Sequence, residues 1–450
     1  MQGWGTVRLV NSRAIAVRVL CSLKDNYYKY EEKIAENIRN SGLSQQNIDY
    51  IYIIVKGVIQ QVRLIDYILS MAVNRPLKKV ERIALNLLRV GVFQEIFLGT
   101  PSHASVNETV EASKDLKRAD LAPFINAVLR HLPEEGVWRK RLEDFDQVER
   151  LSVEYSHPEW LIERWLNRFG QEETKKLLSF NNTYQKIMFR HNPLKSSWSD
   201  FVLKCEQHGF APDLFRSRPI HFFSMGEPGS LIKSELFKDG ECSVQDFSQA
   251  LAVMLLNPKS GENILDVCAG PGGKTTFIAQ LKGKEGEHTA VDIGKGKIEL
   301  LKNECSRLGI DSVNYMVADA MSTKFTTFDK IIIDAPCSGT GVISRHADLR
   351  WNKKSEDLIK LAEIQLGILN NVSHFVDDRG VLLYCTCSLE EEENWGVVEK
   401  FLNSHVDFVI ESAEKFVPKK YCDSYGAIRI LPQKHRMNGS FAVRMVKVIL

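Results

Sequence analysis

Apolar residues recur at three- and four-residue spacings through the first third of the chain. Between residues 13 and 132 this spacing occurs in IAVRVLCSL, IDYIYIIVKGVIQQVRLIDYIL and VERIALNLLRVGVFQEIF, and it is typical of amphipathic helices. Gly42, Pro76, Pro101 and Pro123 interrupt the pattern, as turns between helices do. We therefore predict an all-α domain over residues 1–142.

The pattern changes twice further along the chain. Residues 143–235 combine the helical segment PEWLIERWLNRFG with the short β-like runs KIMFRHN and PIHFFSM, which predicts a linker and a small α+β module. From residue 236 apolar runs alternate with helical segments; the runs are ILDVCA, HTAVDI, VNYMVA, KIIIDA, GVLLYCT, FVIES and FAVRMVKVI. This alternation predicts an α/β domain over residues 236–450 with a mostly parallel, seven-stranded sheet. Ligands of such sheets bind at the carboxyl ends of the strands.

Composition and cysteine usage narrow the class of protein. The 450 residues are 44% hydrophobic and 26% charged, as in ordinary globular proteins. No run of eighteen apolar residues is present, and the first twenty residues lack the features of a signal peptide. We therefore expect a cytoplasmic protein. The nine cysteines contain no CxxC pair, so we expect neither a metal site nor a disulfide framework.

Charge is distributed unevenly between the predicted domains. Residues 1–142 contain 21 Lys and Arg against 14 Asp and Glu, which leaves 38 against 43 for the remainder. A basic helical domain suits a polyanion such as RNA. Charge alone leaves open the simpler interpretation of ordinary scatter over helix surfaces.

A glycine-rich segment, DVCAGPGGKTTF, joins the first predicted strand of the α/β domain to a helix. Such a loop allows a ligand to approach the backbone closely. A phosphate-binding P-loop would need glycine where Cys268 stands, and a dinucleotide fingerprint would need glycine where Thr275 stands. What fits is the first loop of a methyltransferase, which surrounds the methionine part of S-adenosylmethionine. A tight turn without a ligand is the alternative.

Acidic residues end the next two predicted strands. Asp292, about twenty residues beyond the glycines, is placed to bind the ribose hydroxyls of a nucleoside cofactor. Asp319 would lie beside the adenine. Either residue alone is more often a helix cap, but the succession of three such strand ends favours a cofactor site.

Two cysteines follow the fourth and fifth predicted strands. DAPCSGTG contains Asp334 and Cys337, and YCTCSLEEEEN contains Cys387. Most cysteines are simply buried, but two thiols at adjacent strand ends beside a carboxylate favour nucleophilic chemistry. Methylation of cytosine at C5 needs such a set, because a thiolate must attack C6 before C5 can accept a methyl group. Spacing alone does not rank the two cysteines.

Together, DVCAGPGGKT, DAPCSGTG and YCTCSLEEEEN resemble the motifs of the RNA 5-methylcytosine methyltransferases (NOL1/NOP2/Sun). RIALNLLRVGVFQEIF, HASVNETVEASK and FINAVLRHL look like the NusB-like helical domain of the RsmB (Sun/Fmu) branch, and SHPEWLIERW and FRHNPLK look like its RNA-binding insert. The resemblance covers nearly the whole chain. It implies a Rossmann-like class I methyltransferase domain behind two RNA-binding parts, in a monomeric bacterial enzyme that methylates C5 of a cytosine in 16S ribosomal RNA.

The resemblance also implies roles for individual residues. Cys387 would be the nucleophile, Cys337 would assist breakdown of the adduct, and Asp334 would contact the target base and border the cofactor. The residues implied to hold S-adenosylmethionine are Cys268, Ala269, Gly270, Pro271, Gly272, Gly273, Lys274, Asp292, Asp319 and Asp334. Those implied to contact RNA are Arg190, Asn192 and Lys195.

The chain departs from the family pattern in three places. It has Asn438-Gly439-Ser440 where an acidic residue, glycine and phenylalanine are usual, Ala347 where proline is frequent, and Gly270 where alanine is common. None of these changes removes an essential group. Two alternatives remain open: an assembly or RNA-binding factor with an inactive methyltransferase domain, and the same chemistry on transfer RNA or large-subunit RNA.

Overall fold

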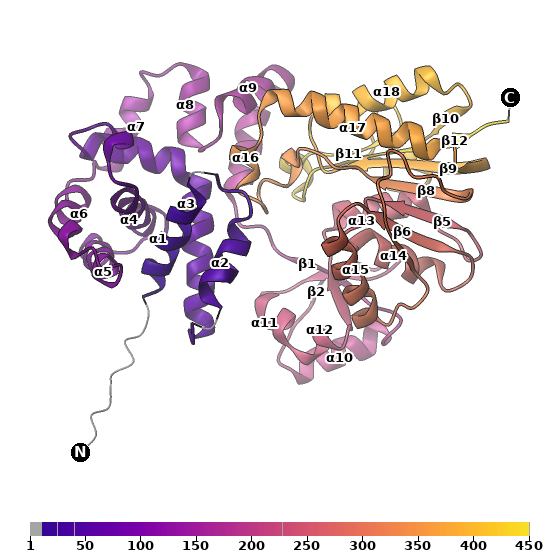
Figure 1. The fold of residues 1–450 in the computed structure, drawn as a ribbon, viewed down its shortest axis with the longest axis horizontal. Helices are drawn as coiled ribbons and strands as arrows, with labels where there is room; N and C mark the ends of the chain where they lie inside the picture. Colours follow the sequence, from indigo (N-terminus) through magenta and orange to yellow (C-terminus); the bar gives the residue numbers. More distant parts are fainter. Residues whose placement is uncertain (1–10, 25, 40, 227, 450) are drawn as a thin grey trace. The chain divides into compact units, whose positions relative to one another are not determined.

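The structure is a computed structural model that describes residues 11–449 except 25, 40 and 227. It contains two compact units, whose elements are labelled in Figure 1. The first unit comprises the chain up to Asn182 together with Arg345–Lys353, and the second comprises Thr183–Ser344 and the chain from Lys354 onward. The chain therefore leaves the second unit after Ser344, contributes a short segment to the first, and returns.

The first unit is helical, as the apolar spacing predicts. Its α-helices are α1 (Ser12–Leu23), α2 (Tyr30–Ile38), α3 (Gln45–Ala72), α4 (Arg82–Val92), α5 (Ser102–Asp115), α6 (Ala122–Leu129), α7 (Glu135–Leu142), α8 (Gln147–Glu154), α9 (Glu159–Asn182) and α16 (Leu349–Asn352). Helices α8 and α9, which lie beyond the predicted boundary at residue 142, group with this unit.

Helix α3 runs through the core of the helical unit. Its start is capped by Ser44, whose hydroxyl accepts a hydrogen bond from the Asn47 backbone N–H. Apolar residues at helical spacing face the core, among them Ile51, Ile54, Val55 and Val58. A Cβ on Gly57 would lie 1.9 Å from the Phe93 ring, so glycine is required for the close approach of this neighbouring segment.

The returning segment Arg345–Lys353 is anchored inside the helical unit. Ala347 belongs to its core cluster, and the Trp351 indole N–H donates to the Ile59 carbonyl oxygen at 2.8 Å. Arg350 is fully buried and donates to the carbonyl oxygens of Gln60 and Ser156 at 3.2 and 3.0 Å. These bonds fasten the returning segment to the backbone of α3 and to the turn before α9.

The second unit begins with a small α+β module, in agreement with the sequence. Its sheet has the antiparallel order β2-β3-β1-β4. The strands are β1 (Met188–His191), β2 (Asp213–Arg216), β3 (Phe222–Ser224) and β4 (Cys242–Val244), and the helices are α10 (Trp198–Gln207), α11 (Pro228–Lys233) and α12 (Glu235–Lys238). Phe189, Phe201 and Phe223 pack together in its core.

A larger sheet forms the centre of the second unit, with the order β10-β12-β9-β8-β5-β6-β7. Its strands are β5 (Ile264–Val267), β6 (His288–Asp292), β7 (Asn314–Val317), β8 (Phe328–Asp334), β9 (Val376–Thr386), β10 (Phe408–Glu411) and β12 (Ser440–Lys447). Strands β5 to β9 pair in parallel, whereas β12 is antiparallel to β9 and β10. An eighth strand, β11 (Ile428–Ile430), pairs with β12 and was not predicted.

Helices cover both faces of this sheet. On one face α13 (Phe247–Leu256) and α14 (Gly273–Lys282) pack in a cluster with Ile264 and Ile332. On the other face α17 (Ser355–Ser373) and α18 (Trp395–Ser404) pack with Leu265 and Ile333 (Figure 1). Helix α15 (Lys295–Leu308) contacts β6 and β7. Across the described part of the chain, no helix is both long and apolar enough to span a membrane.

Candidate active site

The carboxyl ends of the parallel strands meet at one edge of the large sheet. The register pairs Val267 of β5 with Val291 of β6 and with Ile333 of β8. It also pairs Asp334 of β8 with Cys385 of β9. The loops that follow these strands therefore lie side by side, and they contain the predicted cofactor and cysteine motifs.

The glycine loop lies against the end of β6. Asp292 is buried there and accepts hydrogen bonds from the backbone N–H groups of Gly270 (3.2 Å) and Gly294 (2.8 Å). A Cβ on Gly270 would lie 2.4 Å from the Cβ of Lys297, which explains why this chain has glycine rather than alanine. Gly272 has φ +113° and begins the turn into α14, a conformation that favours glycine.

Asp319 follows β7 and is exposed. One of its carboxylate oxygens accepts from the Met321 backbone N–H at 2.9 Å, which fixes the loop at this strand end. The three predicted strand ends, one glycine-rich and two acidic, thus belong to the neighbouring strands β5, β6 and β7.

The two predicted cysteines are in contact. The Sγ atoms of Cys337 and Cys387 lie 3.2 Å apart, and the Gly341 backbone N–H donates to the Cys387 carbonyl oxygen at 2.9 Å. A hydrogen bond to Cys387 and burial together raise the pKa of the Cys337 thiol well above its ordinary value. Cys337 therefore keeps its proton, and its thiol can donate a hydrogen bond to the Cys387 sulfur.

Lys274 and Asp334 form an ion pair beside the cysteines. The Lys274 Nζ atom lies 2.7 Å from a carboxylate oxygen of Asp334, and the side chains are 7% and 37% exposed. Burial alone would lower the pKa of Lys274, but Asp334, Cys385 and Cys387 together outweigh it and raise that pKa. The pair thus places a partly exposed carboxyl group at the surface of the site, in front of a buried lysine.

Comparison with known proteins assigns this arrangement to a family. The sequence model of 16S rRNA methyltransferase RsmB/F matches residues 253–446, that of the NusB family matches residues 10–134, and that of the RsmF/B-like ferredoxin-like domain matches residues 157–216. The probable ribosomal RNA small subunit methyltransferase B of Bacillus subtilis is 34% identical over 97% of this chain and 98% of its own length. The chain belongs to the RsmB/F family of rRNA methyltransferases.

Solved structures agree with this assignment. A methyltransferase homologue from Pyrococcus horikoshii is 26% identical and covers 68% of this chain and 100% of its own, with a TM-score of 0.58. NSun6 from the same organism, solved with SFG, shares the fold at 22% identity and a TM-score of 0.58, over 64% of this chain and 97% of its own. The predicted NusB-like domain, ferredoxin-like module and methyltransferase domain are thereby confirmed.

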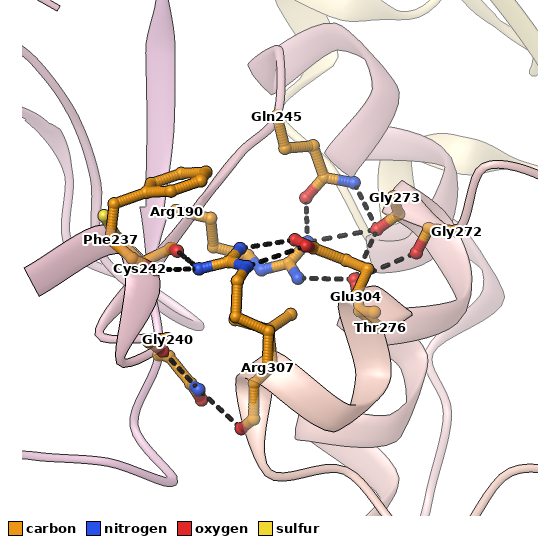
Figure 2. Close-up of polar contacts among 12 residues, drawn as sticks. Arg190, Phe237, Gly240, Cys242, Gln245, Gly272, Gly273, Thr276, Glu304 and Arg307 are labelled. Atoms are coloured by element: carbon orange, nitrogen blue, oxygen red, sulfur yellow. Dashed lines mark hydrogen bonds and ion pairs between the residues drawn. The ribbon is translucent and has the colours of Figure 1, made fainter. Parts of the chain in front are cut away.

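The structure places two of the three residues predicted to contact RNA, Arg190 and Asn192, in the interior. Both side chains are fully buried. Arg190 donates to the Gly273 carbonyl oxygen (3.1 Å), the Thr276 hydroxyl (2.9 Å) and the amide oxygens of Gln245 and Gln280, as Figure 2 shows for the first three of these partners. In this RsmB/F family member Arg190 therefore fastens the ferredoxin-like module to the first turn after the glycine loop.

Asn192 has an equally internal role. Its amide N–H groups donate to the carbonyl oxygens of Gly240 and Leu308, both at 2.8 Å. Of the three predicted RNA contacts only Lys195 is exposed. The motif FRHNPLK therefore combines two internal polar residues with one surface cation, and sequence alone does not separate them.

Sequence reasoning missed a buried carboxylate behind the cysteines. Glu393 is fully buried and bonds to both cysteine loops. It is the last of four consecutive glutamates, a run that usually indicates a solvated surface. Its position next to the cysteine motif is the one sequence signal for it. Among the described residues no three His, Cys, Asp or Glu side chains gather as a metal site would require.

Proposed function

We propose that this chain transfers a methyl group from S-adenosylmethionine to C5 of a cytosine in small-subunit ribosomal RNA, through a covalent bond between Cys387 and C6. The observation that carries the proposal is the contact of two thiols, 3.2 Å apart, beside the Lys274–Asp334 ion pair. RNA as substrate is supported by the relatives of this chain, which are small-subunit rRNA methyltransferases.

The geometry supports Cys387 as the nucleophile. Cys337 holds its proton because its pKa is raised by the hydrogen bond to Cys387 and by burial. A thiol that donates to a second sulfur stabilises the second one as a thiolate, which is the reactive form. This contact supports Cys387 over Cys337 as the nucleophile, a choice that their spacing in the sequence leaves open.

Attack of the Cys387 thiolate forms the C6–S bond and moves the electron pair of the C5–C6 double bond towards C5 and the ring. We assign contact with the ring to Asp334, because its carboxyl group is partly exposed whereas Lys274 behind it is buried. The electron pair is stabilised when a proton is shared between the Asp334 carboxyl group and N3 of the ring, while the buried Lys274 holds that carboxyl group in place.

The residues around the glycine loop fit S-adenosylmethionine. Asp292 is buried against the loop, Asp319 is exposed at the next strand end, and Cys268 has a positive φ of 62° that turns the backbone towards this edge. We propose that residues 268–274 with Asp292, Asp319 and Asp334 hold the cofactor. When bound, it supplies an electrophilic methyl group on sulfur.

Release reverses the covalent step. The C5 proton must pass to a base, the electron pair restores the C5–C6 double bond, and the C6–S bond breaks so that Cys387 leaves as a thiolate. We assign assistance of this step to Cys337, because its Sγ atom lies 3.2 Å from the sulfur that must leave and its thiol can hydrogen-bond to the departing thiolate.

We assign binding of the RNA outside the target base to the basic parts of the chain. Lys195 is exposed in the ferredoxin-like module, and residues 1–142 have an excess of seven positive charges. Phosphate contacts by such residues fix the orientation of RNA without reading its sequence.

The test uses the full chain, unmodified small-subunit rRNA and S-adenosylmethionine with a tritiated methyl group. Tritium in 5-methylcytidine after nuclease digestion is the expected result, and tritium in another nucleoside, or none, would overturn the proposal. On RNA with 5-fluorocytosine, Cys387→Ala should abolish the covalent complex, whereas Cys337→Ala should let the adduct with ordinary cytosine accumulate. The reverse pattern would exchange the two assigned roles.

A further inference from the structure

The loops that contain the two cysteines are joined by one buried carboxylate. Glu393 lies in the turn between β9 and α18 and accepts hydrogen bonds from the Ser338 backbone N–H (2.7 Å), the Ser338 hydroxyl (2.5 Å) and the Ser388 hydroxyl (2.5 Å). Ser338 directly follows Cys337, and Ser388 directly follows Cys387. The carboxylate therefore contacts the residue next to each sulfur.

A second layer holds the carboxylate itself. The Gln365 amide donates to Glu393 at 3.1 Å and to the Pro336 carbonyl oxygen at 2.9 Å. The Tyr384 hydroxyl bonds to the Glu393 carbonyl oxygen at 2.5 Å and to the Gln365 amide oxygen at 3.0 Å. Glu393, Gln365 and Tyr384 are all buried, so the carboxylate has little freedom to move.

The two loops also touch each other at this level. The Ser338 and Ser388 hydroxyls lie 3.1 Å apart, and the Leu389 backbone N–H donates to the Thr340 hydroxyl at 2.9 Å. Each of these contacts fixes backbone rather than sulfur. The distance between the two thiols is thus fixed by a hydrogen-bond network beneath the two loops, and that network includes neither sulfur.

We propose that Glu393 is a positioning residue that holds Cys337 and Cys387 in contact, and so determines both how readily Cys387 attacks and how readily its adduct is released. The proposal rests on the proposed covalent mechanism. A buried carboxylate costs solvation energy, and its acceptor sites are matched here by donors from both loops. An amide in its place offers one acceptor oxygen and adds two N–H groups where donors already point.

The principal test measures alkylation of the thiols in the full chain, without cofactor or RNA. Iodoacetamide is applied across pH 6 to 10, and the labelling of Cys337 and Cys387 is followed by mass spectrometry of the two peptides. In the native chain Cys387 should react first, because Cys337 retains its proton. In Glu393→Gln the preference should fall by roughly tenfold, since Cys387 loses a hydrogen bond to its charged form.

Ser338→Ala and Ser388→Ala separate the two halves of the network. Ser338→Ala removes the hydroxyl bond to the carboxylate but keeps the backbone one, and so loosens the Cys337 loop; adducts on cytosine RNA should then be released slowly. Ser388→Ala frees the Cys387 loop, so adduct formation should slow. These variants keep Glu393 in place and test the same proposal if Glu393→Gln does not fold.

Glu391→Gln is the matched control, with the same substitution in the same turn. Glu391 pairs with Arg429 at the protein surface, so its loss should leave thiol preference and adduct kinetics unchanged. Native preference and native kinetics in Glu393→Gln would overturn the positioning role. Failure of the native chain to form any adduct on 5-fluorocytosine RNA would instead overturn the covalent mechanism, so the two failures are distinguishable.

Discussion

Replacement of Arg190 by methionine should loosen the glycine loop rather than weaken RNA binding. The guanidinium group is fully buried, where desolvation lowers its pKa to about 9, and it lies over the Phe277 ring at 4.7 Å. Methionine retains most of the apolar stem. The variant therefore removes mainly the hydrogen bonds that join the ferredoxin-like module to α14.

The magnitude follows from the partners that remain. The Gly273 carbonyl oxygen keeps a bond from the Gln245 amide at 2.8 Å, and the Thr276 hydroxyl keeps its bond to the Gly272 carbonyl oxygen at 2.9 Å. The side-chain oxygens of Gln245 and Gln280 lose their donor. Each unsatisfied buried acceptor costs about 1–3 kcal/mol. The two acceptors together cost about 2–6 kcal/mol. Removal of a buried charge offsets part of this cost, so we expect local destabilisation of about 2–4 kcal/mol.

Hydrogen exchange of the full chain, followed by mass spectrometry of peptides within residues 270–282, measures this local opening. A loss of 2–4 kcal/mol corresponds to exchange faster by roughly 30- to 1,000-fold. Lys195→Met is the control, because Lys195 is exposed in the same module. It should leave this exchange unchanged and weaken RNA binding. The slope of log affinity against log salt concentration should fall in magnitude by about one. Native exchange in Arg190→Met, combined with RNA binding as weak as in Lys195→Met, would refute the internal role.

Three further predictions follow from other residues. Burial raises the pKa of Asp266 to about 7, above the value of about 3.9 in an unfolded chain. Between these two pH values Asp266 is protonated in the folded state and ionised in the unfolded state. The free energy of unfolding should therefore fall as pH rises from about 4 to 7. Asp266→Asn should remove this slope in denaturation curves, and an unchanged slope would contradict the assignment. In Gly341→Ala a Cβ would lie 2.6 Å from the Cys387 carbonyl oxygen, so adduct formation should slow by at least about tenfold, whereas Gly296→Ala, with open space around it, should match the native rate. Arg350→Met removes the buried donor to the carbonyl oxygens of Gln60, Ser156 and Asn181 and should destabilise the helical unit by about 2–4 kcal/mol, measured as faster proteolysis of the first 182 residues; native resistance would argue against the anchor.

Local patterns were sufficient for most of the fold. The helical spacing of the first domain and the alternation of strands and helices after residue 236 each reflect which face of an element is buried, and that information is written in adjacent residues. Strand β11 was not predicted because Ile428–Ile430 is only three residues long and forms a strand by pairing with β12. A short run of this kind has no period from which a strand can be inferred.

The candidate site was predicted where chemistry is local and missed where it depends on distant partners. Cys337, Cys387 and Asp334 follow strands whose parallel order brings their ends together. The assignment of Arg190 to RNA rests on the resemblance of FRHNPLK to an RNA-binding insert, whereas its burial depends on residues of α14 far along the chain. Glu393 was hidden for the same reason, since its partners Ser338 and Gln365 come from separate loops and helices.

The segment Arg345–Lys353 has a consequence for how the protein is made. The ribosome synthesises helices α1 to α9 first, and N-terminal domains usually fold as they emerge. Here the helical unit still lacks Ala347, Arg350 and Trp351, which belong to its interior. The unit made first can be completed only after the loop with Cys337 has been synthesised. Completion of the helical unit is thus delayed until the chain already contains Cys337.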